Sequence, residues 1–128
     1  MSGVHSKDSI LEAFVEASNK YEFSLDISLV TNGTVVSGTL VSAEEYFKQL
    51  SKSFKGGNDV AKAFSEKFSE AEDAASSTTD EVQFVHMKDV KIYIGDNKPT
   101  PSKGTPLWRG KIHEVDSFFL GKINGKAE

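Results

Sequence analysis

Residues 22–41 read EFSLDISLVTNGTVVSGTLV, and this stretch decides the fold. From Glu22 to Leu29 polar and apolar side chains alternate, which is the period of an antiparallel strand with one buried face. Asn32-Gly33 follows, a pair that tight hairpins prefer because both central positions need a positive φ. The stretch therefore predicts a β-hairpin over 22–41, in which Gly38 marks a bulge, a sharp bend or close packing against a neighbour.

Helical patterns lie on both sides of this hairpin. Residues 9–20 begin with Ser9 and Glu12 in the S-x-x-E spacing of a capping box, and an apolar stripe follows at helical spacing. Ser42 and Glu45 repeat the box and open a helical insertion over 42–71, in which Gly56-Gly57 ends one amphipathic helix. The next helix is expected over about residues 59–71.

The rest of the chain divides into a linker, strands and two ends. Residues 72–81 are rich in acids and hold no large apolar side chain, so we expect a mobile acidic linker there. Alternating apolar residues predict strands within 82–123, interrupted by a proline-rich loop over 95–106. Lys88-Asp89 marks either a bend in one long strand or a break between two. Residues 1–7 and 124–128 are expected to be loose.

This order predicts a single α+β domain with a small, strongly curved antiparallel sheet of about five strands. A leading helix followed by five short strands resembles an Sm-like or SH3-like partly open barrel. The segment Trp108-Arg109-Gly110-Lys111-Ile112 also resembles the hydrophobic-Arg-Gly strand of the Sm-like family. The departure is large, because residues 42–81 separate the second and third strands. A plain twisted sheet packed by helices is the alternative.

Composition and charge narrow the choice of partners. The chain has no cysteine, and no run of ~20 apolar residues or secretory leader is recognisable, so we expect a cytoplasmic protein. The net charge of −4 disfavours nucleic acid and anionic membrane as partners. Residues 56–81 hold seven acids and two lysines, whereas residues 82–128 hold eight basic residues and five acids. This asymmetry offers a head-to-tail contact between copies.

Residues with catalytic chemistry do not form a recognisable set. The three histidines lie in distant segments without metal-ligand spacing, and no nucleophile elbow or phosphate-binding loop occurs. His86 is expected on a strand, within or beside the core. We therefore expect no enzyme activity, no cofactor and no metal.

The candidate interaction residues are aromatic, basic or acidic. Trp108 is either a core residue, with Arg109 exposed or paired with an acid such as Asp116, or an outward anchor. Phe118 and Phe119 cannot share a face, so one of them must contact a helix, a second subunit or a partner. The full set of candidates is Trp108, Arg109, Lys111, Phe118, Phe119, Glu70, Glu72 and Asp73.

Several blocks, in order along almost the whole chain, resemble the gas vesicle accessory family GvpU. They are LEAFVEASNK (11–20), FSLDISL (23–29), VSGTLVSA (36–43), YF (46–47), FVHMK (84–88), KIY (91–93), WRGKI (108–112), VD (115–116) and FFLGKI (118–123). The resemblance implies a cytoplasmic accessory role in clustering and organising gas vesicles, with no known catalysis.

Three hypotheses of function follow. The first is a protein-interaction factor that associates with itself and with the vesicle shell through weak, repeated contacts. The second is an Sm-like nucleic-acid-binding module, suggested by Arg109 and Gly110. The third is a chaperone-like factor that holds a gas vesicle shell protein in an apolar groove between the helical insertion and the sheet.

Overall fold

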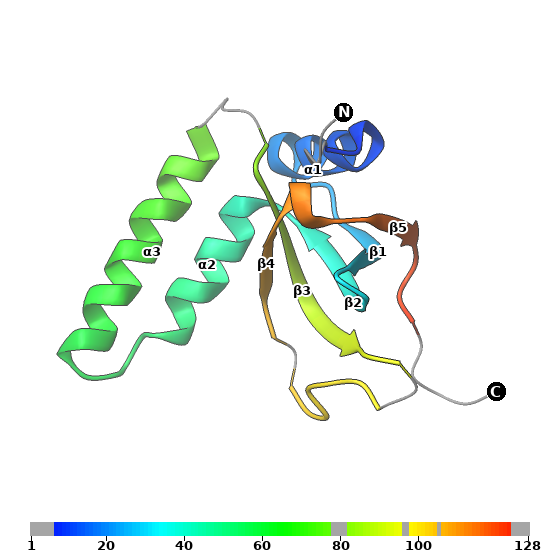
Figure 1. Cartoon of the computed structure of the whole chain (residues 1–128). Coiled ribbons are helices and arrows are strands. Elements are labelled where there is room, and N and C mark those ends of the chain that lie inside the picture. Colours follow the sequence, from blue (N-terminus) through cyan, green and yellow to red (C-terminus); the bar gives the residue numbers. More distant parts are fainter. Residues whose placement is uncertain (1–6, 78–81, 96–97, 105, 124–128) are drawn as a thin grey trace.

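The β-hairpin forms the middle of a five-stranded antiparallel sheet, flanked by three helices (Figure 1). The structure, a computed structural model, describes residues 7–77, 82–95, 98–104 and 106–123. The elements in chain order are α1 (Ser9–Tyr21), β1 (Leu25–Thr31), β2 (Thr34–Val41), α2 (Ala43–Ser53), α3 (Asp59–Ser77), β3 (Phe84–Tyr93), β4 (Trp108–Lys111), the 3-10 turn η1 (Ile112–Glu114) and β5 (Ser117–Leu120).

The hairpin and its irregularity are confirmed. Asn32 and Gly33 both adopt positive φ angles, 51° and 76°, and Thr31 faces Thr34 across the turn. The pairing of β2 with β3 shifts register at Gly38, where an added Cβ would lie 2.8 Å from the carbonyl oxygen of Lys88. Gly38 thus permits a close approach of two backbones. Lys88-Asp89 bends one continuous strand, with Asp89 at φ 55°.

The strand order is β4-β3-β2-β1-β5, so β4 and β5 are the two edges. η1 joins them directly along the chain. The α+β class and the five antiparallel strands are confirmed. No pairing between β4 and β5 closes the sheet within the described strands, so neither the Sm-like or SH3-like barrel nor strong curvature is confirmed.

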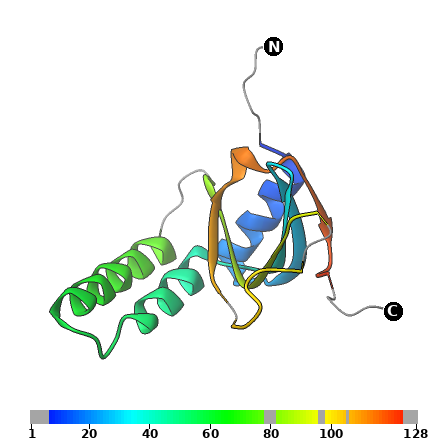
Figure 2. The same cartoon turned by 60° about the horizontal axis from the view of Figure 1, so that its bottom comes forward.

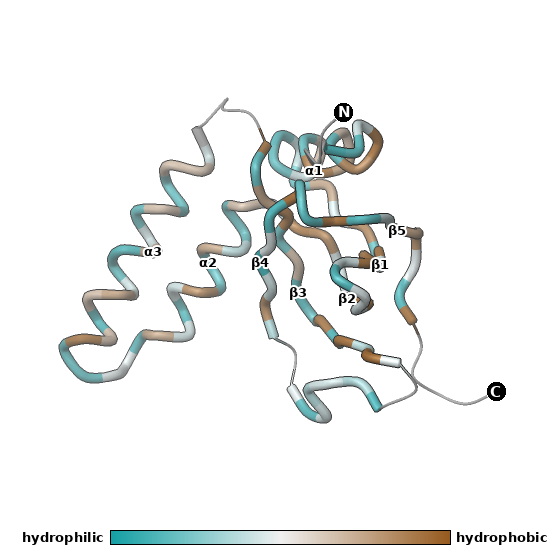
Figure 3. Tube along the Cα trace, viewed as in Figure 1, coloured by the Kyte–Doolittle hydropathy of each residue, from teal (hydrophilic) through white to brown (hydrophobic). Residues whose placement is uncertain are grey.

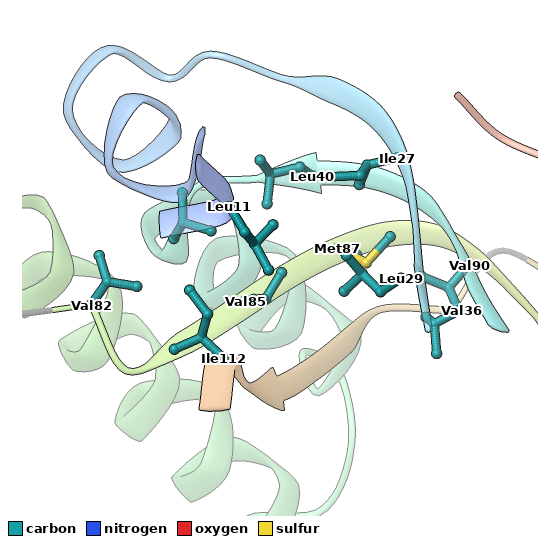
Figure 4. Packing of buried hydrophobic residues seen from close by; sticks show 11 residues of the cluster. Leu11, Ile27, Leu29, Val36, Leu40, Val82, Val85, Met87, Val90 and Ile112 are labelled. Atoms are coloured by element: carbon teal, nitrogen blue, oxygen red, sulfur yellow. The ribbon is translucent and has the colours of Figure 1, made fainter. Parts of the chain in front are cut away.

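The core lies between α1 and one face of the sheet (Figure 4). α1 supplies Leu11 and Val15, both essentially inaccessible to solvent. The strands and η1 supply Ile27, Leu29, Val36, Leu40, Val85, Met87, Val90 and Ile112. The alternation read in residues 25–29 places Ile27 and Leu29 in this core and Leu25 against it, whereas Phe23 precedes β1 and stays exposed. Burial of this apolar area stabilises the domain.

α1 begins one residue earlier than its capping box suggests. Asp8, rather than Ser9, is the N-cap, and its carboxylate accepts hydrogen bonds from the backbone nitrogens of Ile10 (2.8 Å) and Leu11 (3.1 Å). The prediction of a Ser9–Glu12 box was therefore wrong by one position, because Asp caps as well as Ser. The Ser42 cap of α2 is confirmed, since its hydroxyl accepts from the Glu45 nitrogen at 3.0 Å.

α2 and α3 form a helical hairpin that extends away from the sheet, as both views show (Figures 1 and 2). At the crossing, Ser51 and Ser65 are buried, and each hydroxyl donates to the other residue's carbonyl oxygen, at 2.8 and 3.0 Å. Small side chains and paired hydroxyls let the two backbones approach closely.

The expected linker is partly helical. α3 continues past Ala71 to Ser77, so residues 72–77 are not a linker, and residues 78–81 lie outside the described part. Alanine and glutamate favour the helix here without burial. The expectations for residues 1–6 and 124–128 also fall outside the described residues, whereas Lys7 donates to the Val82 carbonyl oxygen at 2.8 Å.

Replacing Ser18 by alanine is expected to stabilise the folded protein. Its hydroxyl is fully buried on α1 and has no hydrogen-bond partner in the part of the chain that is described. A buried polar group without a partner costs about 1–3 kcal/mol, so Ser18→Ala should raise the free energy of unfolding by about 1 kcal/mol. Urea unfolding measures it, with Ser69→Ala on exposed α3 as the control for helix propensity alone. A loss of stability in Ser18→Ala would contradict the prediction.

Candidate functional site

The helical hairpin carries a row of aromatic rings, of which Phe64 is exposed and the others are half-buried. Phe47 of α2 and Phe54, the residue that caps its C-terminus, meet Phe64 and Phe68 of α3, with ring centroids 5.6–6.5 Å apart. Val60 is 64% exposed and Phe64 45% exposed. We call these five side chains the hairpin surface; Figure 3 shows hydrophobic residues recurring along both helices. Contiguous exposed apolar area of this kind marks interaction surfaces.

At the base of the hairpin surface, a cation is fixed on an aromatic ring. The guanidinium carbon of Arg109 lies 3.7 Å from the centroid of Phe84 and 5.7 Å from that of Phe47. The Arg109 Nε donates a hydrogen bond of 3.1 Å to Nε2 of His86. These contacts follow from the sheet register, which pairs His86 with Arg109 and Phe84 with Lys111 on one face. The guanidinium is thereby held in one orientation.

His86 acts as a hydrogen-bond acceptor because it is uncharged. It is 5% exposed and packs against Tyr46 and Phe47, with ring centroids 4.7 and 5.8 Å away. Burial, and secondarily the positive charge of Arg109, lowers the pKa of His86 to about 3. A neutral imidazole can present one bare nitrogen to the Arg109 N–H. The expectation of a strand histidine within or beside the core is confirmed.

The structure places Trp108 and Arg109 on opposite faces of β4. Trp108 packs against the core cluster, and its ring lies over Gly110, where an added Cβ would clash with it. Arg109 contacts His86 rather than Asp116, whose carboxylate accepts instead from the Asn32 nitrogen at 3.2 Å. The basic side chain, not the tryptophan, is therefore the part of this segment that faces outward.

A second apolar surface lies at edge strand β5, on the opposite side of the molecule from the hairpin (Figure 1). Phe118 packs edge-on against Phe14 of α1, with ring centroids 6.1 Å apart. Phe119 is 46% exposed and Leu120 is 57% exposed. We call Phe119 and Leu120 the β5 surface. The expectation that Phe118 and Phe119 diverge is confirmed, with a helix as the contact of Phe118.

The segment after β5 is tied to the sheet, so the β5 surface is held by fixed backbone. The Gly121 carbonyl oxygen accepts a hydrogen bond of 2.8 Å from the Ser28 hydroxyl. The Ile123 nitrogen donates to the Ser37 hydroxyl oxygen at 2.8 Å. Both serines lie on the face of the sheet opposite the core, which explains why polar residues are buried there.

The three candidate acids lie on α3 and point different ways around it. Glu70 follows Val60, Ala63 and Lys67 at spacings of three and four residues, so these side chains share one exposed edge of the helix. Glu72 lines a polar hollow of about 350 Å³ with Lys48 and Lys52 of α2 and Lys55 of the turn that follows it, among others. Asp73 already makes a contact within the chain. Of the three, Glu70 lies on the edge of α3 that also carries Val60 of the hairpin surface.

A groove of about 540 Å³ separates α2 from the sheet. It is lined by Tyr46, Gln49, Leu50 and Ser53 of α2 on one wall and by Lys88, Asp89, Pro106 and Leu107 on the other. Burial raises the pKa of the Tyr46 phenol, opposed by the nearby Arg109 charge. The size is that of a small-ligand or short-peptide site.

Neither a metal-binding cluster nor a membrane-spanning helix is present within the described ranges. No three histidine or acidic side chains there come together in a way that could hold a metal ion. No described helix combines the length and the apolar character that crossing a membrane requires.

The fold is that of a small α+β domain with a helical hairpin inserted between its second and third strands. The chain belongs to the GvpU-like family, since residues 8–123 match the family described as "Gas vesicle protein GvpU-like". It is therefore a protein of the gas vesicle system, as the resemblance of its sequence blocks predicted. Neither a curated protein nor a solved structure matches it.

Two features of the site were missed by sequence reasoning. The amphipathic pattern of residues 42–71 predicts helices but not what covers their apolar sides, so the exposure of Val60 and Phe64 was not predicted. The sequence does indicate this exposure. Each helix of the insertion has phenylalanines on its apolar side, and no further apolar helix follows that could cover them. The contact between His86 and Arg109 had no signal, because it depends on the register of β3 with β4.

Proposed function

We propose that this chain is a non-enzymatic accessory protein that holds gas vesicles together in the cytoplasm through protein–protein contacts. One observation supports this most strongly: the hairpin surface and the β5 surface are both exposed and lie on opposite sides of the molecule (Figure 1). A molecule that bridges two bodies needs two separate contact surfaces. The β5 surface would contact the shell, and the hairpin surface would contact another copy.

Repetition makes weak contacts sufficient for this role. A vesicle shell repeats one subunit many times, so many bound copies act together and their avidity exceeds the affinity of one copy by about 10²–10⁴-fold. Aromatic side chains are enriched at such contacts because they bury large apolar area. Two modest surfaces on a small domain are therefore enough for bridging.

Co-flotation tests the shell contact. Purified gas vesicles rise on centrifugation, and we expect the wild-type chain to rise with them. Phe119→Ser combined with Leu120→Ser removes the apolar side chains of the β5 surface, and we expect the bound fraction at a fixed protein concentration to fall at least about fivefold. The matched control is Ile10→Ser, because Ile10 is 61% exposed but lies on α1, outside both surfaces. Equal flotation of the double variant and the control would contradict this use of the β5 surface.

A chaperone-like role is the second candidate, favoured by the groove between α2 and the sheet. The groove has apolar walls at Leu50 and Leu107 and charges at Lys88 and Asp89, features that suit a short segment of an unassembled shell protein. The two roles differ in what the chain binds. A chaperone binds the shell subunit before assembly and leaves the finished vesicle, whereas a bridging protein floats with it.

A further inference from the structure

We propose that Arg109 is the anchor of a contact between two copies of this chain, and that it binds the Glu70 carboxylate of the second copy. This inference rests on the self-association proposed above and names the side chains that direct it. Its first support is that the exposed guanidinium of Arg109 is held in one orientation in which it can bind a carboxylate of another molecule.

Arg109 is oriented by His86, Phe84 and Phe47, but no carboxylate binds it among the described residues. Its Nε is used by His86, and its planar group stacks on Phe84. The ion pairs formed among the described residues are Lys7–Glu12 and Lys122–Asp26, so no described acid neutralises Arg109. The two terminal nitrogens of a guanidinium can bind both oxygens of one carboxylate. Fixing the group beforehand lowers the entropy that is lost on binding.

The ligand chemistry follows from the neighbours of Arg109. Next to it, the hairpin surface offers Phe47 and Phe68, and further along it offers Phe64 and Val60. A matching segment must therefore carry apolar side chains followed, along its length, by an acid. The exposed edge of α3 has this order, with Val60 and Ala63 first and Glu70 about two turns later.

A second copy is thus the occupant that the charges favour. If two copies lay their α3 helices side by side in the same direction, apolar residues of each would cover the hairpin surface of the other. Glu70 of each copy would then face Arg109 of the other. A two-fold axis makes these two contacts equivalent, which closes the pair and leaves both β5 surfaces free to contact vesicles.

A charge exchange between two variants tests the pairing. Arg109→Glu alone and Glu70→Arg alone each place like charges opposite one another, and we expect each to raise the dissociation constant for self-association at least about tenfold in low salt. An equimolar mixture of the two variants restores opposite charges at both contacts, so association should return in the mixture. Analytical ultracentrifugation of the full chain measures all three samples. Glu16→Arg on α1, an exposed acid outside both surfaces, is the matched control for the charge reversal and should associate like the wild type.

Each outcome has a distinct meaning. If the wild type associates but the mixture stays as weak as its components, the Arg109–Glu70 pairing is wrong and the bridging function is unaffected. If the wild type remains monomeric on vesicles as well as in solution, the bridging function fails too. Added salt should weaken wild-type association, because exposed charge pairs are screened, and salt-independent association would contradict the electrostatic anchor. Thermal unfolding of each variant confirms that it is folded.

Discussion

Acidification should unfold this protein through His86. The pKa of this buried imidazole is about 3 in the folded chain and near 6.5 when unfolded. Between these two pH values the unfolded chain binds a proton at His86 that the folded chain does not bind. Stability is therefore complete above about pH 6.5 and falls, as the pH is lowered toward 3, by up to about 1.4 kcal/mol per pH unit from this group alone.

His86→Gln isolates that contribution. The glutamine side-chain oxygen can still accept the Arg109 Nε–H but takes up no proton. Urea unfolding gives the free energy of unfolding of both proteins at each pH. We expect the variant-minus-wild-type difference in this free energy to increase by about 2–3 kcal/mol from pH 7 to pH 4.5. Carboxylates titrate equally in both chains and cancel in this difference. Parallel pH profiles, or an imidazole that titrates near pH 6.5 by NMR in the folded chain, would contradict the account.

The strands were predictable because their signals are local. Alternation over Phe23 to Leu29 and the positive φ required at Asn32-Gly33 are written in adjacent residues, and the structure confirms the hairpin, with its first strand beginning at Leu25. The same holds for the bulge at Gly38, although which backbone approaches it could not be foreseen. Closure of the sheet depends on contacts between distant edges, and no local pattern reports it.

The helical and charged parts were less predictable. The linker interpretation of residues 72–81 failed over 72–77 because a lack of apolar residues does not prevent an alanine- and glutamate-rich helix from continuing. Arg109 was identified as a candidate, but its partner was not. His86 was correctly expected within or beside the core, but its pairing with Arg109 follows from the register of β3 with β4, which no local pattern reports.

Clustering of vesicles depends on the hairpin surface if copies meet there. Val60→Ala together with Phe64→Ala removes its two most exposed members while favouring the α3 helix. Each truncation at a contact centre weakens binding by about 1–2 kcal/mol, and many copies act at once on one pair of vesicles. We therefore expect the double variant to lose clustering at least about tenfold, while it still floats with vesicles through the β5 surface.

Light scattering of purified gas vesicles, read as the protein is added, tests this bridging most directly. The account predicts that the wild-type chain raises the scattering as vesicles cluster. The Val60→Ala, Phe64→Ala variant should bind vesicles to the same extent and leave them dispersed. Vesicles that cluster equally with both proteins, or that remain dispersed with a saturating amount of wild-type chain, would contradict it.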